Sequence, residues 1–193
     1  MNVHDTRLPG LKRIELAVFH DDRGYFLETH QVARYAQALG VDLAFVQDNC
    51  SHSRQGVLRG LHYQVNRPQG KLVRVAQGEV FDVAVDLRPD SPSFGQWEGF
   101  HLLSPALSQA RGAAHMQLWI PPGYAHGFYA LSDGAMVEYK CTDTYHANDE
   151  ACLLWDDADV AIAWPGREPA LSDKDRAGSS LSALRRAGLL PCV

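Results

Sequence analysis

Short apolar runs separated by turn residues constrain this chain more than any other feature of its sequence. From Leu11 to Trp164 the chain consists largely of such runs, and Pro, Gly, Asp and Ser cluster between them. The segment Phe81–Leu87 alternates strictly, with four large apolar residues on one face and Asp82, Ala84 and Asp86 on the other. A period of two is typical of a β-strand. Many short strands with few helices favour two packed sheets, so we predict an all-β jelly roll, a double-sheet β-sandwich.

The expected helices are few, short and peripheral. The spacing of apolar residues predicts one helix over His30–Leu39, ending at Gly40, and a C-terminal helix over Ser179–Gly188. The expected strands are Lys12–Phe19, Val46–Ser53, Gly56–Gln64, Lys71–Ala76, Phe81–Leu87, Gly95–Leu103, Met116–Ile120, Gly127–Leu131 and Ala135–Thr142. The 193 residues contain no repeat or low-complexity linker. We expect one domain over residues 1–193, with residues 177–193 as a helical tail.

Charge and composition exclude several classes of partner. The net charge is −5, hydrophobic residues make up 46% of the chain, and no apolar run approaches 18 residues. We therefore expect binding neither to nucleic acid nor to membranes. Four scattered cysteines without a C-x-x-C pair, and no secretory signal at the N-terminus, favour free thiols in the cytoplasm. Any anion site must be a local cluster of Arg and Lys.

Such a cluster follows from two adjacent apolar runs joined by a Pro/Gly turn. Arg59 and His62 lie in the first run and Lys71 begins the second, so a β-hairpin would bring them together. A neutral His abstracts a proton near pH 7, and a Lys beside it stabilises an oxyanion. An Arg binds phosphate through two parallel hydrogen bonds. The three residues predict carbanion chemistry on a phosphorylated or nucleotide-linked substrate.

The spacing of Arg59 and His62 raises a geometric problem. Residues three apart point to opposite faces of a regular strand. If both serve one site, the strand must contain a bulge, and Gly60 is the natural place for it. The alternative is that Arg59 faces elsewhere.

A second motif concerns a possible metal. Residues 121–126 read Pro-x-Gly-x-x-His, which resembles the second signature of the cupin superfamily, where the residue matching His126 binds a metal. Cupin metal sites also use a His-x-His and a Glu from an earlier hairpin, but this chain offers only His62 there. A catalytic metal needs three or more nitrogen or oxygen ligands. We therefore expect a cupin-like fold without the metal site.

Two further groups are candidates for proton transfer. Tyr139, on a predicted strand, is either a core aromatic or a proton donor through its phenol. A carboxylate against His62 would orient its ring and stabilise the imidazolium, and both Asp175 and Asp82 are available for this role.

The motifs taken together resemble the dTDP-4-dehydrorhamnose 3,5-epimerase family over nearly the whole chain. The most specific segments are residues 47–51, 56–64, 70–75, 78–86, 117–128, 139–140 and 153–157. The resemblance implies a homodimeric, cofactor-free jelly roll that acts on a nucleotide-linked 4-keto-6-deoxyhexose. It implies that His62 is the base, Asp175 its partner with Asp82 a possible second, Lys71 the enolate-stabilising cation and Tyr139 the acid. The substrate-binding residues that it implies, some of them acting across the dimer, are Arg23, Glu28, Gln47, Asp48, Asn49, Arg59, His126, Glu150 and Lys174.

One segment departs from the family pattern. Residues 104–115 are longer than expected and rich in small residues, and we interpret them as a mobile loop insertion. Near the pocket mouth, such an insertion could change which carbon or sugar is served. Three alternatives to a 3,5-epimerase stay open. They are a C3-only or C5-only epimerase of a dTDP- or CDP-linked sugar, a metal-dependent cupin enzyme, and a non-catalytic sugar- or nucleotide-binding jelly roll.

Overall fold

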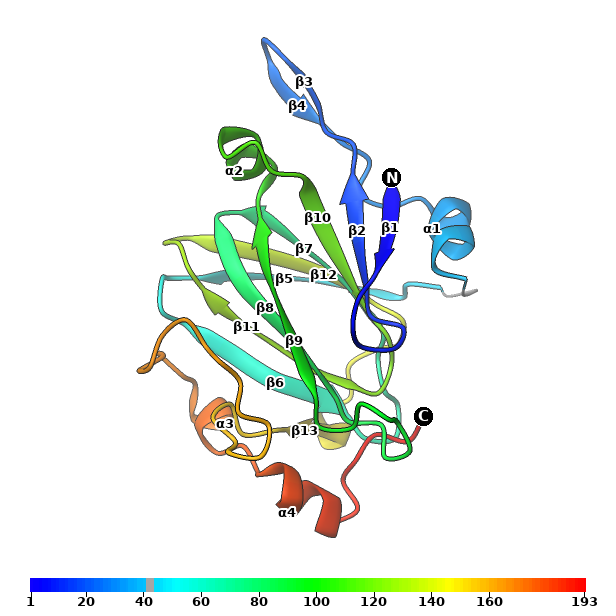
Figure 1. The fold of residues 1–193 in the computed structure, drawn as a ribbon, viewed down its shortest axis with the longest axis vertical. Coiled ribbons are helices and arrows are strands. Elements are labelled where there is room, and N and C mark those ends of the chain that lie inside the picture. The colour runs from blue at the N-terminus through cyan, green and yellow to red at the C-terminus, as the bar shows by residue number, and fades with distance from the viewer. Residues whose placement is uncertain (41–43) are drawn as a thin grey trace.

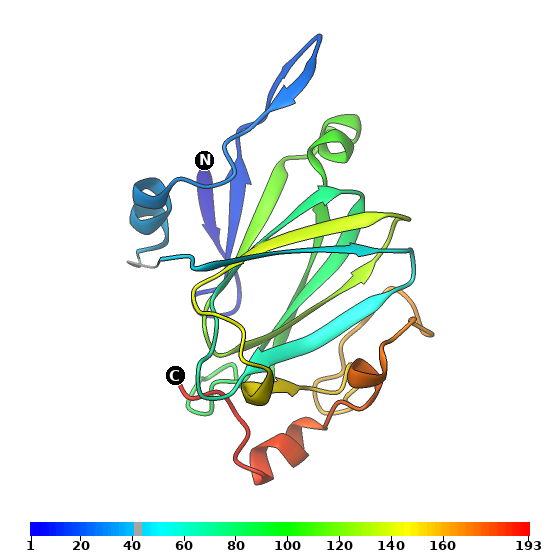
Figure 2. The same ribbon diagram turned by 180° about the vertical axis from the view of Figure 1, so that it is seen from behind.

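Two antiparallel sheets face each other in the computed structural model, which describes residues 1–40 and 44–193 (Figures 1 and 2). The six-stranded sheet has the order β1 (Asn2–Asp5), β2 (Lys12–Leu16), β10 (His115–Ile120), β7 (Lys71–Gln77), β12 (Ala135–Cys141) and β5 (Gln47–Ser53). The five-stranded sheet has the order β13 (Glu150–Cys152), β6 (Leu58–Gln64), β11 (Tyr124–Ala130), β8 (Glu79–Asp86) and β9 (Trp97–Leu103). The predicted all-β, cupin-like jelly roll is confirmed.

The remaining elements are short and lie around the sandwich. A two-stranded hairpin, β3 (Phe19–Asp21) and β4 (Gly24–Phe26), projects away from both sheets. The helices are α1 (Val32–Leu39), α2 (Pro105–Ala110), α3 (Asp173–Arg176) and α4 (Leu181–Arg186), together with a 3₁₀ turn at Ala147–Asp149. A helix with the length and apolarity needed to cross a lipid bilayer is absent from residues 1–40 and 44–193.

In the part of the chain that the structure describes, apolar side chains form three clusters, one between the sheets and two on their outer faces. The central cluster joins inward-facing residues of both sheets, such as Val75, Leu118 and Phe128. A second cluster covers the outer face of the five-stranded sheet with the C-terminal segment, including Leu181 and Leu184 of α4. The third packs α1 on the outer face of the six-stranded sheet. Where a sheet is covered on both faces, the polar residues that point inward must find partners.

Strand β8 shows how alternation works in a sheet that is covered on both sides. Val83 and Val85 pack in the cluster under the C-terminal segment, whereas Ala84 packs between the sheets. Asp82 and Asp86 lie on the same face as Ala84 and are completely buried. The predicted division of faces is correct, and the polar face of the strand points into the protein.

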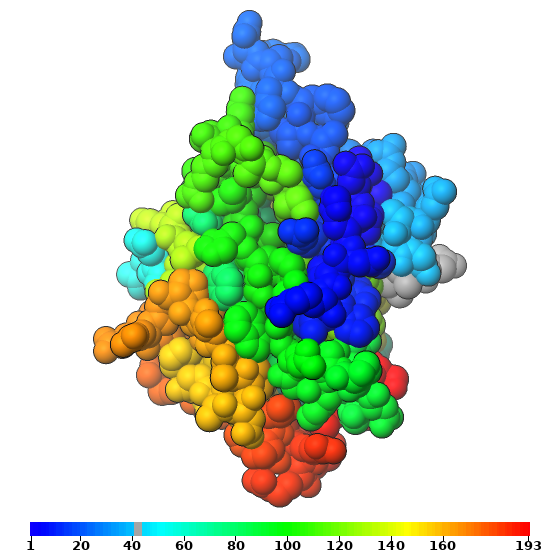
Figure 3. All heavy atoms as spheres, viewed as in Figure 1, coloured from blue at the N-terminus to red at the C-terminus, as the bar shows by residue number. Residues whose placement is uncertain are grey.

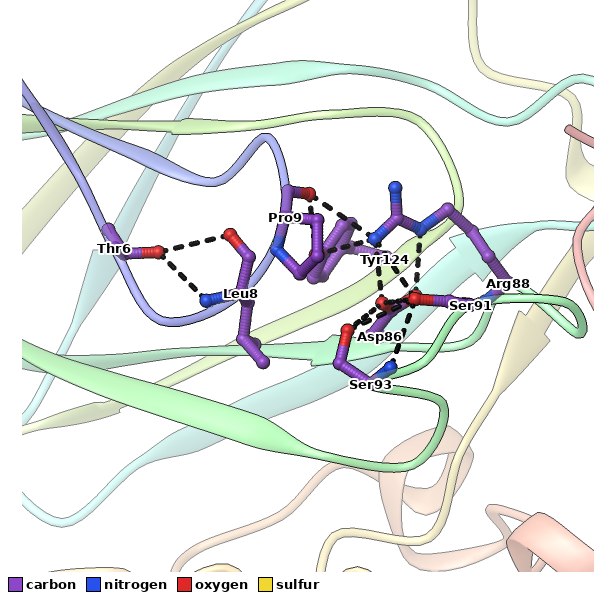
Figure 4. Close-up of polar contacts among 8 residues, drawn as sticks. All are labelled: Thr6, Leu8, Pro9, Asp86, Arg88, Ser91, Ser93 and Tyr124. Carbon is purple, nitrogen blue, oxygen red and sulfur yellow. Dashed lines mark hydrogen bonds and ion pairs between the residues drawn. The ribbon is translucent and has the colours of Figure 1, made fainter.

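Asp86 is held by a network that fixes the loop after β8 (Figure 4). Its carboxylate accepts hydrogen bonds from Arg88 Nε at 2.8 Å and from Ser93 Oγ at 2.6 Å, and a further one from Ser91 Oγ. Arg88 Nη2 also donates to Tyr124 Oη at 2.9 Å. Burial alone would raise the pKa of Asp86, but the bonds from Arg88 and the two serines outweigh it and lower that pKa.

The helix predictions are confirmed in type and differ slightly in extent. Helix α1 ends at Gly40, which has φ = 69° and donates its N–H to the Ala36 carbonyl at 3.0 Å. This left-handed C-terminal residue is the role in which glycine is preferred. The predicted strand Lys12–Phe19 is shorter than expected, because Phe19 belongs to the separate hairpin.

The interpretation of residues 104–115 as a loop was wrong for residues 105–110, which form helix α2. Ser104 caps helix α2 by accepting a hydrogen bond from the Leu107 N–H, and Pro105 occupies the first helical turn. Proline is favoured there because its missing N–H would have no partner in any case. His115 then begins β10, and its Nδ1 contacts the Leu103 carbonyl at 3.0 Å.

The β3–β4 hairpin forms a protrusion at one end of the molecule (Figure 3). Phe19 is 64% exposed and Phe26 is 71% exposed. An isolated two-stranded hairpin is at best marginally stable in water. This segment therefore presents apolar surface that its own chain does not cover.

Candidate active site

A cavity of about 440 Å³ lies between the two sheets near β5, β6 and β12. Both sheets contribute to its walls, as do helix α3 and the segment before β13. Ten of the residues predicted from the sequence line it: Gln47, Asn49, Arg59, His62, Lys71, His126, Tyr139, Glu150, Lys174 and Asp175.

The strand irregularity predicted at Gly60 is present and brings Arg59 to the cavity. In the pairing of β6 with β11, His62 lies opposite His126, but Arg59 rather than Gly60 lies opposite Phe128. One extra residue is thus inserted in β6, which places Arg59 and His62 on the same wall. Gly60 has φ = 125°, and a Cβ there would lie 2.5 Å from the Gly127 Cα. Only glycine fits this close approach of two strands.

His62 is paired with Asp175. Its Nε2 lies 2.6 Å from Asp175 Oδ1, and the side chains are 25% and 4% exposed, respectively. The other carboxylate oxygen accepts a 2.7 Å hydrogen bond from Ser172 Oγ, the N-cap of α3. Burial alone would raise the pKa of Asp175, but the bonds from His62 and Ser172 outweigh it and lower that pKa. An ionised Asp175 assigns the ring proton to Nε2 and leaves Nδ1 of His62 as the basic nitrogen.

Asp82 does not contact His62, contrary to the second possibility considered from the sequence. Its carboxylate oxygens lie 2.9 and 3.0 Å from His126 Nε2. In the five-stranded sheet β11 lies between β8 and β6. Neighbouring strands are about 4.8 Å apart, so Asp82 on β8 is roughly 10 Å from the strand of His62. Asp82 instead orients His126, which is 6% exposed.

Lys71 is buried next to the His62–Asp175 pair, but the predicted β-hairpin does not bring it there. Its strand β7 and the strand β6 of His62 belong to different sheets, which face each other across the cavity. Its Nζ donates to the backbone carbonyl of His62 at 3.3 Å, and the residue is 8% exposed. Burial lowers the pKa of Lys71, while the negative charges of Glu150 and Asp82 act in the opposite direction. A buried ammonium of this kind is stabilised by any negative charge that develops in the cavity.

Tyr139 lies on the wall opposite His62. It belongs to β12 of the six-stranded sheet, whereas His62 belongs to β6 of the five-stranded sheet. Its ring also packs against the central apolar cluster and contacts His126 edge-on at 6.4 Å between centroids. Burial raises the pKa of the Tyr139 phenol, so the group stays protonated at neutral pH. The core role and the proton-donor role are thus compatible in one side chain.

Polar residues at the cavity rim are held by one another. Lys174 Nζ lies 2.8 Å from Glu150 Oε2. Arg59 Nε donates to Ser53 Oγ at 2.9 Å, which fixes the guanidinium along β5. Gln47 Nε2 donates to Asn49 Oδ1 at 3.0 Å. These groups provide donors and charges suited to a polar, anionic ligand.

Three residues predicted for substrate binding lie outside the cavity of their own chain. Asp48 points to the other face of β5, as strand alternation requires, and pairs with Lys140 at 2.9 Å. Arg23 is at the tip of the β3–β4 hairpin with its side chain 90% exposed. Glu28 follows that hairpin and pairs with Arg34 at 2.8 Å.

The cavity also contains residues that sequence reasoning did not select. Ser51 shares the face of Gln47 and Asn49, so strand alternation could have identified it. Ser172 was detectable as the N-cap of a helix that carries Asp175. Tyr145 lies outside regular structure and donates its hydroxyl to Glu150 at 2.9 Å. No local pattern marks Tyr145.

Comparisons with known proteins identify the family of this chain. A family model described as dTDP-4-dehydrorhamnose 3,5-epimerase matches residues 5–183. The chain is 48% identical to the protein of that name from Pseudomonas aeruginosa, covering 92% of this chain and 95% of that protein. It is also 48% identical to the one from Neisseria gonorrhoeae over 98% of this chain, although it spans only 55% of that longer protein.

Solved structures give the same result. A dTDP-6-deoxy-D-glucose-3,5-epimerase from Legionella pneumophila, solved with dTDP-4-keto-L-rhamnose, is 49% identical with a TM-score of 0.91, covering 100% of this chain and 98% of that chain. A 3′-monoepimerase from Streptomyces bikiniensis, solved with dTDP-quinovose, is 32% identical with a TM-score of 0.87 and covers 97% and 92%. The chain belongs to the dTDP-4-dehydrorhamnose 3,5-epimerase family, a family of isomerases.

Proposed function

We propose that the protein inverts C3 and C5 of dTDP-4-dehydro-6-deoxy-D-glucose to give dTDP-4-dehydro-L-rhamnose. One observation carries the proposal. A His–Asp pair with a buried carboxylate and a protonated tyrosine line opposite walls of one cavity, with an ammonium beside the histidine. Inversion at a carbon requires a base on one face and an acid on the other, and these facing walls supply both.

The chemistry follows from the C4 ketone, which acidifies the protons on C3 and C5. Nδ1 of His62 removes one of these protons, and the electron pair of the C–H bond moves onto the C4 oxygen. The Lys71 ammonium stabilises this enolate, and Asp175 stabilises the imidazolium. The Tyr139 phenol then returns a proton to the opposite face of the carbon. His62 releases its proton to solvent and Tyr139 regains one before the second carbon reacts.

The groups at the rim are suited to the nucleotide end of such a substrate. Arg59 would bind the diphosphate through its guanidinium, and Lys174 would add a second positive charge. Gln47, Asn49 and Glu150 would hydrogen-bond the sugar or the base. His126, which is held by Asp82, would contact the sugar from strand β11.

Deuterium exchange tests this function directly. Incubation with the 4-keto sugar in D₂O should place deuterium at both C3 and C5, as followed by NMR. Label at one carbon alone would instead favour a monoepimerase like that of Streptomyces bikiniensis. His62→Ala should abolish exchange at both carbons, whereas His52→Ala, on the exposed side of β5, should leave the rate unchanged. Exchange that survives in His62→Ala would remove His62 as the base.

We also propose that two copies of the chain form a dimer in which each hairpin completes the site of the other copy. The exposed Phe19 and Phe26 supply the apolar surface for such a contact. Arg23 and Glu28, which lie outside their own cavity, would then reach the nucleotide in the partner's site. The positively charged side chain of Arg23, at the tip of the projecting hairpin, is suited to binding a diphosphate.

Subunit mixing tests this arrangement. His62→Ala and Arg23→Ala proteins, each weakly active alone, are mixed under conditions that exchange subunits. If the hairpin acts across the dimer, each mixed dimer contains one intact site out of two. About half of the dimers are mixed after random pairing, so activity should rise to about a quarter of the wild-type value. If Arg23 serves its own chain, mixing should restore nothing.

A further inference from the structure

Strand β13 brings a thiol to the His62–Asp175 pair. Cys152 lies directly opposite His62 in the antiparallel ladder between β13 and β6. Side chains of directly opposed residues project from the same face of a sheet, with their Cβ atoms about 5 Å apart. The Cys152 Sγ, a ring nitrogen of His62 and a carboxylate oxygen of Asp175 all lie within 4.8 Å of one another.

These three donors match the preference of zinc and similar thiophilic divalent ions. Such ions bind thiolate, imidazole and carboxylate together, with the ligand atoms of a tetrahedral site roughly 3.3–3.6 Å apart. The present spread, from 2.6 Å between His62 and Asp175 up to 4.8 Å, needs side-chain shifts of only about 1 Å. A thiolate and a carboxylate also neutralise the two positive charges of the ion.

The surroundings supply the support that a metal site requires. Ser172 Oγ holds one oxygen of Asp175 and the Gly60 N–H donates to the other. Such outer contacts orient ligands and strengthen binding. His62 and Asp175 border the main cavity, while Cys152 borders a separate cavity of about 330 Å³ next to Leu184. The cluster is thus bordered by cavities through which an ion can reach it.

We propose that His62, Cys152 and Asp175 form an inhibitory site for a thiophilic divalent cation such as Zn²⁺. The ion inserts between His62 and Asp175 and coordinates Sγ, with the thiol proton released to solvent. If Nε2 coordinates, the single proton of the neutral ring moves to Nδ1; if Nδ1 coordinates, its lone pair is taken by the ion. In both cases the basic nitrogen is lost. This inference rests on the proposed role of His62, since only a base can be disabled in this way.

Cobalt binding tests the site independently of activity. Metal-free protein without substrate is titrated with Co²⁺, and thiolate-to-cobalt charge transfer is followed in the near ultraviolet. We expect one equivalent of this absorption in the wild type and in Cys50→Ser, and its loss in Cys152→Ser and Cys152→Ala. Absence of the band in the wild type, or its persistence without Cys152, overturns the proposal.

Deuterium exchange with added Zn²⁺ tests the inhibition. Zinc should suppress exchange in the wild type, EDTA should restore it, and Cys152→Ser should exchange normally but need at least about tenfold more zinc for suppression. Equal zinc sensitivity of the two proteins overturns the inference, as does loss of exchange on chelation, which would make the ion a cofactor. If metal-free wild type shows no exchange, the proposed function fails, while the cobalt spectrum still decides whether the site exists.

Discussion

Replacing Gly60 by alanine should damage both stability and activity. The backbone there has φ = 125°, and the added Cβ would lie 2.5 Å from Gly127 Cα and 2.8 Å from the His126 carbonyl oxygen. The conformation costs about 1–3 kcal/mol for a residue with a side chain, and overpacking against backbone adds about 1–3 kcal/mol. The sum of roughly 2–6 kcal/mol is a large part of the 5–15 kcal/mol that stabilises a typical domain.

Urea unfolding at fixed protein concentration measures this loss. With a slope of about 2 kcal/mol per molar urea, the midpoint should fall by roughly 1–3 M. Gly24→Ala is the matched control, because Gly24 has φ = 127° and an alanine Cβ at this position would meet no atom within 4 Å. It should show the conformational cost alone. An unchanged midpoint in Gly60→Ala would refute the argument that the bulge requires glycine.

The exchange rate of the folded Gly60→Ala protein provides a second measure. The bulge places Arg59 and His62 on one wall, and misplacing catalytic groups by about 1 Å lowers rates on the order of a hundredfold. A folded variant that exchanges at the wild-type rate would show that the position of the bulge does not matter for catalysis.

Three further predictions concern buried charges. Asp175→Asn should lower the D₂O exchange rate by about 10²–10⁴-fold with little change in substrate affinity, and a normal rate would exclude an orienting role for Asp175. Asp86→Ala should lower the unfolding free energy at pH 7, by up to about 3–5 kcal/mol, because the partly buried Arg88 is left without its carboxylate partner. The pKa of Asp86 is lowered on folding, so the Asp86 carboxylate stabilises the folded protein above its unfolded pKa of about 3.9. This stabilisation is lost as the pH falls through the pKa of Asp86 in the folded protein. Urea titrations from pH 6 to pH 3 should therefore show a flatter pH dependence of stability in the variant. Lys71→Met should abolish exchange yet raise stability at pH 7. Because burial lowers the pKa of Lys71 on folding, its ammonium opposes folding at pH values below the unfolded value of about 10.4; a destabilised Lys71→Met protein would contradict this.

Local sequence indicated the two strands that carry Arg59, His62 and Lys71. The hairpin predicted from these strands was wrong, because β6 and β7 belong to different sheets. Alternation defined Phe81–Leu87, and a glycine between Arg59 and His62 indicated the bulge, because both depend on the geometry of one strand. The helix at residues 105–110 was also readable from its Ser-Pro start, which we interpreted as a loop because the segment is rich in small residues.

Tertiary structure alone decided which charges meet. The residues by themselves left both Asp82 and Asp175 available to His62, and the family resemblance placed Asp175 first. The strand order β6-β11-β8 gives Asp82 to His126, and His62 pairs with Asp175, 113 positions away. The thiol of Cys152 joins that pair only through the register of β13 on β6. Such contacts depend on the order and alignment of strands that are distant in the sequence. The alternation of apolar and polar residues does not fix that order, because it specifies which face of a strand is buried and not which strand lies beside it.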